Sequence, residues 1–135
     1  MNYWLVKSEP GSYSWADLVR DGRTSWDGVR NFQARNHLRT MRPGDQALFY
    51  HSVNERAVVG VARIVSQPYP DPAAPDWTVV DVESAFGLKS PVSLDRIKEE
   101  PALKHMVLLR QSRLSVQPLR KQEFDAIVKL GGRAR

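Results

Sequence analysis

Short runs of aromatic and β-branched residues, each closed by proline or glycine, constrain the fold of this chain most strongly. The first run, residues 3–7, precedes Pro10 and Gly11, and proline cannot donate to the ladder of a central strand. Comparable runs follow at 46–51, 57–67, 77–84 and 114–117, the last closed by Pro118. Strands this short leave exposed edges unless their sheet curls on itself. The pattern therefore predicts an α/β (α+β) fold in which about five strands form a small barrel with interspersed helices.

Glycine and capping residues indicate where the chain turns. Gly60 lies inside the second long run, where we expect a bulge that lets the sheet bend. Ser14 with Asp17 predicts a capping box for a helix that ends at Gly22. Further helices are expected at 31–41, at 94–100 and around 124–130. The proline-rich segment 69–76 is expected to be an exposed loop.

The charge balance favours a polyanionic partner. Twenty Lys and Arg against fifteen Asp and Glu give a net charge of +5. The absence of cysteine excludes disulfides and thiolate metal sites. No apolar run approaches the length of a membrane span, and the first residues do not resemble a signal peptide. We expect a cytoplasmic monomer that binds no membrane, no metal and no cofactor.

The segment 26–35 concentrates chemistry suited to a nucleobase. Trp26 offers stacking, Asn31 an amide for edge hydrogen bonds, and Arg30 and Arg35 a charge for phosphate. Two ordinary interpretations stay open beside this one. Tryptophan is common in cores, and asparagine is a leading helix N-cap. Arg35 and Arg39 also share a helix face with Arg42, which is either a solvated face or a phosphate contact.

Several segments, in order and with their spacing intact, resemble the EVE domain family. They are residues 3–10, 26–35, 44–45, 49–52, 59–60 and 113–116. The resemblance covers essentially the whole chain, so we expect one domain over residues 1–135 without an attached effector nuclease. It implies a fold similar to the PUA domain, a curled β-barrel of five or six strands flanked by short helices, with the YTH and ASCH domains as relatives.

The resemblance also implies a function. EVE domains are thought to recognise modified bases, so we expect a non-enzymatic module that accepts a flipped modified base, a modified cytosine in particular, from DNA or RNA. The base-binding candidates are Lys7, Ser8, Trp26, Val29, Asn31, Tyr50, His51 and Ser52. The phosphate-binding candidates are Arg30, Arg35, Arg39, Arg110 and Arg113. Which modification is bound, and in which polymer, stays open.

Other classes of function remain as alternatives. Some ASCH relatives resemble amidohydrolases that act on modified nucleosides, and Lys7, Glu9 and His51 could supply acid–base groups. His51 and Ser52 are neighbours on a strand and face opposite sides, so they predict no catalytic dyad. The remaining histidines lack metal-ligand spacing. A sensor of a free base or nucleotide is the second alternative, and a protein–protein adaptor is a weaker third.

Overall fold

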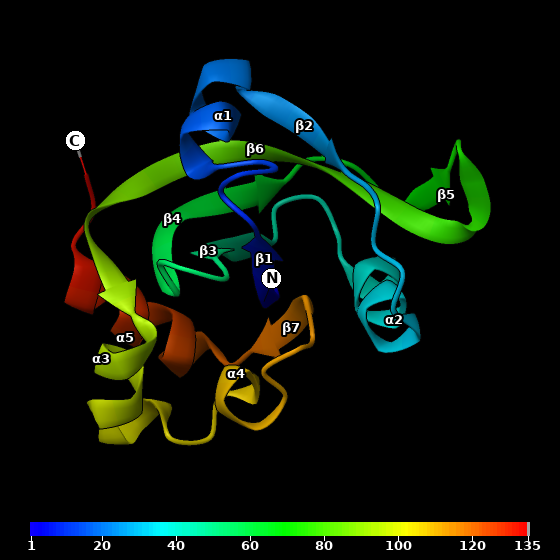
Figure 1. Ribbon diagram of the computed structural model, residues 1–135. Coiled ribbons are helices and arrows are strands. Elements are labelled where there is room, and N and C mark those ends of the chain that lie inside the picture. Colours follow the sequence, from blue (N-terminus) through cyan, green and yellow to red (C-terminus); the bar gives the residue numbers. More distant parts are fainter. Residues whose placement is uncertain (135) are drawn as a thin grey trace.

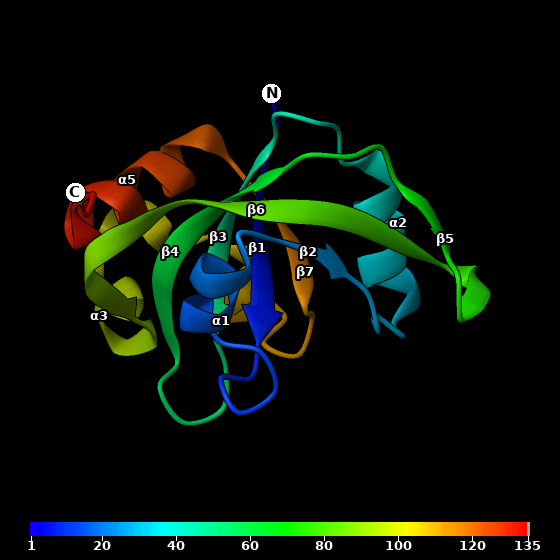
Figure 2. The same cartoon turned by 90° about the horizontal axis from the view of Figure 1, so that it is seen from above.

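The computed structural model describes residues 1–134, and Arg135, the last residue of the predicted domain, lies outside them. Within that range seven strands form one curled sheet with helices on both faces (Figures 1 and 2). The strands are β1 (Tyr3–Ser8), β2 (Arg23–Trp26), β3 (Gln46–His51), β4 (Ala57–Ile64), β5 (Tyr69–Asp71), β6 (Ala74–Ser93) and β7 (Val116–Leu119). The helices are α1 (Trp15–Asp21), α2 (Phe32–Thr40), α3 (Leu94–Glu99), α4 (Val107–Arg110) and α5 (Lys121–Gly131), with a 3-10 turn at Pro101–Leu103. None of the helices in the described range is both long and apolar enough to cross a membrane.

The strand order is β2-β6-β4-β3-β1-β7, with β5 paired to β6 alone. β1 runs parallel to β3, and the other neighbours are antiparallel. The long β6 arches over the molecule, and the edge strand β2 pairs with it (Figure 1). The predicted curled α+β architecture is confirmed. The sheet remains open and has seven strands instead of five or six.

The sheet separates two apolar cores, because successive residues of a strand face opposite sides. Trp4 and Val6 of β1 pack into the core covered by α1 and α2. Leu5, between them in sequence, packs into the other core against α3 and α5. The central strands β1, β3 and β4 are therefore buried on both faces. Packing on both faces fixes the positions at which β1 and β3 end.

The bulge expected near Gly60 is present, since the β4–β6 register shifts between Val58 and Gly60. The structure adds a second reason for glycine at this position. A Cβ atom built on Gly60 would lie 2.5 Å from Cε2 of Trp15, well inside the contact distance of two carbon atoms. The indole of Trp15 thus rests directly on the backbone of β4.

We expect Gly60→Ala to lower the free energy of unfolding by about 1–3 kcal/mol, because the added methyl group overpacks against Trp15. Gly87→Ala is the matched control: its Cβ would lie 3.3 Å from Nε1 of the same indole. Urea denaturation should show a clearly smaller loss for the control. Equal stability of Gly60→Ala and the parent would contradict the close packing of this ring.

Two expectations from proline were wrong. The segment 69–76 is not a loop, because β5 and the start of β6 pair there as a hairpin. Pro70 and Pro118 both lie within strands, β5 and β7. Each of these strands pairs with one neighbour only, so its other edge is unpaired. A proline whose nitrogen faces the unpaired edge removes no hydrogen bond from the sheet. The strand expected at 77–84 also extends much further, over the 20 residues of β6.

Candidate functional site

A cavity of about 480 Å³ opens between the two edges of the curled sheet. Trp26 at the end of β2 lines it on one side, and Ser115, just before β7, lines it on the other. The complete lining is Lys7, Ser8, Glu9, Ser12, Tyr13, Thr24, Ser25, Trp26, Asp27, Gly28, Val29, Arg30 and Ser115. Its volume is within the range of small-ligand sites. The cavity exists because β6 brings the two sheet edges face to face.

Trp26 forms an aromatic wall that also rests on the core. It is half-buried, and its ring meets the edge of Phe49 with 5.5 Å between the centroids. Val29 is largely buried and also lines the cavity. Between them Gly28 adopts a positive φ of 74°, which turns the chain away from β2 and toward α2. This turn lets residues from both ends of the segment face one cavity.

The end of β1 supplies two polar groups that already donate hydrogen bonds to backbone carbonyls. The ammonium of Lys7 donates to the carbonyl oxygen of Ser112, and partial burial lowers the pKa of Lys7 below that of an ordinary lysine. The hydroxyl of Ser8 donates to the carbonyl oxygen of Tyr13. The Ser8 oxygen therefore faces a ligand as an acceptor. With the carboxylates of Glu9 and Asp27, it makes this side of the cavity rich in acceptors.

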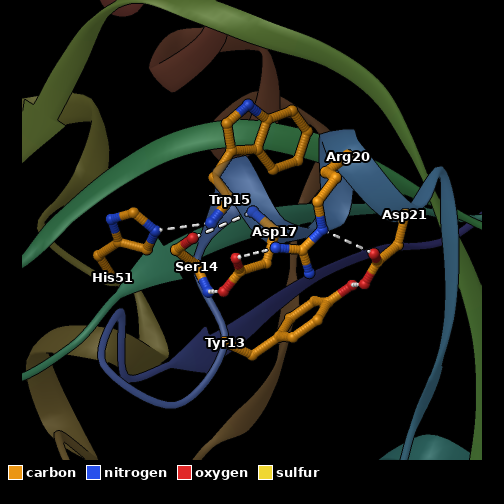
Figure 3. A network of polar contacts seen from close by, with 7 residues as sticks. All are labelled: Tyr13, Ser14, Trp15, Asp17, Arg20, Asp21 and His51. Atoms are coloured by element: carbon orange, nitrogen blue, oxygen red, sulfur yellow. Dashed lines mark hydrogen bonds and ion pairs between the residues drawn. The ribbon is translucent and has the colours of Figure 1, made fainter.

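Tyr13 is held at the cavity by the network at the start of α1 (Figure 3). Its hydroxyl donates to Asp21 at 2.9 Å, and partial burial, followed by this bond, raises the pKa of Tyr13. Arg20 joins Asp21 to Asp17 through contacts of 3.0 and 3.1 Å. Asp17 and Ser14 complete the predicted capping box. The network fixes the cavity rim to α1, from the N-cap Ser14 to the last residue, Asp21.

The candidates Tyr50, His51 and Ser52 do not line the cavity. Nε2 of His51 accepts from the backbone N–H of Trp15 at 3.0 Å, which places the ring proton on Nδ1 for the 2.6 Å bond to Glu55 (Figure 3). Tyr50 is buried in the second core, and the backbone N–H of Ser52 donates to the carbonyl of Ser8. These residues join β3 to α1 and to the end of β1.

Asn31 lies beside the cavity rather than in its wall. Its side-chain oxygen accepts from the N–H of Ala34 at 2.9 Å, so the helix-capping interpretation is confirmed. Asn31 and Arg113 line an adjoining hollow of about 340 Å³. Arg110 lies in a different hollow, next to α5 and β7. The structure therefore brings together Lys7, Ser8, Trp26, Val29 and Arg30, and it separates them from Arg110.

The arginines of the segment 30–39 bind the β5–β6 hairpin. Arg30 pairs with the buried carboxylate of Asp71 at 3.3 Å. Arg35 donates to the carbonyl oxygen of Asp76, and Arg39 donates to the hydroxyl of Thr78, both at 3.1 Å. These contacts position guanidinium groups along one side of the molecule, starting at the cavity with Arg30.

Sequence reasoning did not select several residues that line the cavity, among them Tyr13, Thr24 and Ser25. The strand β2 was not predicted, because its four residues, Arg-Thr-Ser-Trp, carry little β-branched or apolar signal. Had the strand been recognised, the period of two would have placed Thr24 on the same face as Trp26. Tyr13 had no comparable signal, since its position depends on a turn.

A curled α+β sheet of this order, with a polar cavity between its edges, is a PUA-like fold. The EVE domain family model matches residues 2–130, and the chain belongs to the EVE domain family. A structure from Rhodopseudomonas palustris superimposes with a TM-score of 0.94 at 43% identity, covering 98% of this chain and 94% of that one. Rat thymocyte nuclear protein 1 is 39% identical over 96% of this chain and 73% of its own length.

One solved relative contains DNA. The crystal structure of human THYN1 in complex with DNA that contains 5-methylcytosine has a TM-score of 0.90 at 34% identity, covering 100% of both chains. A mutant ASCH protein from Zymomonas mobilis, at 13% identity and a TM-score of 0.60, shares the fold alone.

Proposed function

We propose that this chain is a non-enzymatic reader that binds a flipped, modified cytosine of DNA or RNA in the cavity beside Trp26. The observation that carries the proposal is the cavity itself, where an indole wall faces a cluster of hydrogen-bond acceptors. The likeness over the whole crystallised chain of human THYN1, which was crystallised with DNA containing 5-methylcytosine, supports the same ligand class.

The chemistry of the lining suits cytosine. Stacking of a base on Trp26 contributes about 1–3 kcal/mol. The exocyclic amino group of cytosine is a donor that carboxylates accept well, and Ser8, Glu9 and Asp27 all offer acceptor oxygens. A buried methyl group adds about 0.8 kcal/mol, a factor of roughly four in affinity. Base identity is therefore selected mainly by hydrogen bonds, and methylation by a smaller packing term.

Extruding a base from a duplex costs a few kcal/mol, which stacking and phosphate contacts must offset. Arg30 is placed for this role, since it lines the cavity and its side chain remains 44% exposed despite the pair with Asp71. Arg35 and Arg39 continue the positive surface along α2.

The residues that line the cavity favour binding over hydrolysis. His51, the strongest acid–base candidate, has both ring nitrogens engaged by Trp15 and Glu55, away from the cavity. The Lys7 ammonium is bound to a backbone carbonyl. A hydrolase needs a nucleophile, a base and a group that orients the base, and the cavity lining brings no histidine near its serines.

An oligonucleotide panel tests the proposal, using strands that differ only in cytosine against 5-methylcytosine. We expect tighter binding of the modified strand, and an affinity that falls by about 0.7–0.9 log unit per log unit of salt for each phosphate contact. Mass spectrometry should recover the strand chemically unchanged. Salt-insensitive binding would argue against phosphate contacts, and product in excess of protein would establish an enzyme.

A further inference from the structure

An aromatic pair, the exposed Phe32 and the partly buried Trp77, lies outside both cores, between α2 and the β5–β6 hairpin. Phe32, the first residue of α2, is 66% exposed, and its ring stacks on Trp77 of β6 with 5.2 Å between centroids and 25° between planes. The guanidinium of Arg35 lies 4.8 Å from the Phe32 centroid and 5.4 Å from that of Trp77. We call Phe32, Trp77, Arg30 and Arg35 the aromatic platform.

The composition of the platform is unusual for a surface that only faces water. A phenyl ring at the first turn of a helix gives up the stabilisation that burial would provide, and many residues could occupy that position. Nε of Arg35 is buried, yet it has no hydrogen-bond partner among residues 1–134. The guanidinium is thus held by the two rings, as in cation–π contacts, and by one hydrogen bond to the carbonyl oxygen of Asp76.

The platform is continuous with the base cavity through Arg30. This residue lines the cavity, and its guanidinium lies 5.5 Å from the Trp77 centroid. Beyond Trp77, Arg39 and Arg42 line a hollow of about 390 Å³. Guanidinium groups therefore surround the rings and continue away from the cavity. Rings that stack bases, interleaved with charges that bind phosphate, are the chemistry of a single-strand binding surface.

We propose that the aromatic platform stacks the unpaired nucleotide next to the base held in the cavity, with Arg30 binding the phosphate between them. This inference rests on the proposed function of the cavity. Every base has a π face, so the platform accepts any neighbouring base. It adds affinity for the polymer without adding selectivity for the modification.

Phe32→Ala tests the inference, since alanine is a good helix former and the ring is mostly exposed. The probe is a single strand of about nine nucleotides with a central 5-methylcytosine or cytosine. We expect affinity to fall by roughly 5- to 140-fold, by the same factor for both strands. Binding of the nucleoside 5-methylcytidine, which has no neighbour, should be unchanged. Phe32→Tyr should restore binding of the strand.

Val19→Ala is the matched control, because Val19 is 54% exposed on α1 and should leave affinity for the strand unchanged. Parental affinity of Phe32→Ala for the strand would overturn the platform and leave the exposed ring to a protein partner. Equal losses for strand and nucleoside would also overturn it, since the change would then act on the cavity. If the parent protein binds the 5-methylcytosine strand and the cytosine strand with equal affinity, the proposed function is wrong. The platform is still supported in that case if Phe32→Ala weakens binding of both strands by the same factor. A parent that binds neither strand overturns both.

Discussion

Replacing Trp26 with alanine should weaken binding of a 5-methylcytosine oligonucleotide by roughly 5- to 140-fold, because stacking on an aromatic ring contributes about 1–3 kcal/mol per base. The loss should fall on base-specific affinity, while the salt dependence due to the arginines stays. Titration of the modified strand at two salt concentrations separates these contributions. Binding equal to that of the parent would place the base elsewhere in the protein.

Trp26→Ala also carries a cost in stability, because the half-buried ring packs on Phe49. We expect a loss of about 2 kcal/mol, below the 3–5 kcal/mol that removal of a fully buried tryptophan costs. Trp15 provides the matched control. It also meets the edge of Phe49, with 5.4 Å between centroids, but it does not line the cavity. Trp15→Ala should therefore lower the melting temperature and spare binding, and weakened base affinity in this variant would contradict the assigned wall.

Asp45→Ala should have the largest effect on folding, a loss of about 3–5 kcal/mol, since three donors lose their acceptor at about 1–3 kcal/mol each with some relaxation. Asp45 is 3% exposed. Its carboxylate accepts from the N–H groups of Asn2 and Arg42 and from Nε1–H of Trp4, each at 3.0 Å. It thereby joins the start of β1 to the turn before β3. Urea denaturation measures the loss.

Asp45→Asn is the control for this prediction. Asparagine keeps one carbonyl oxygen but replaces the other with an amide group that cannot accept, so we expect a loss of about 1–3 kcal/mol. Affinity for the oligonucleotide should be retained by the folded fraction of both variants, because Asp45 does not line the cavity. A stability of Asp45→Ala within about 0.5 kcal/mol of the parent, as at an ordinary surface site, would contradict the role of this carboxylate.

Local hydrogen bonding was predictable from residue type. Ser14 with Asp17 and Gly22 as a helix end were expected, Asn31 as an N-cap was one of two open interpretations, and all three are present. Each depends on groups three or four residues apart, so the chain nearby is sufficient to specify it. The prediction for the segment 69–76 was wrong because its structure depends on pairing with a neighbouring strand and not on nearby residues. Its prolines predict a loop, and only its pairing with β6 shows that they occupy an edge strand.

The amino-acid sequence was enough to predict the family, the curled α+β class and the helix caps. It also marked the segment 26–35, where the cavity wall, the helix cap and the aromatic platform all begin. Which polar groups share the cavity depends on the tertiary structure. Ser115 joins Trp26 there because β6 curls the sheet until its edges face each other, and His51 is kept away by its bonds to Trp15 and Glu55. Residues far apart in the chain meet through strand register and curvature, which no local pattern encodes.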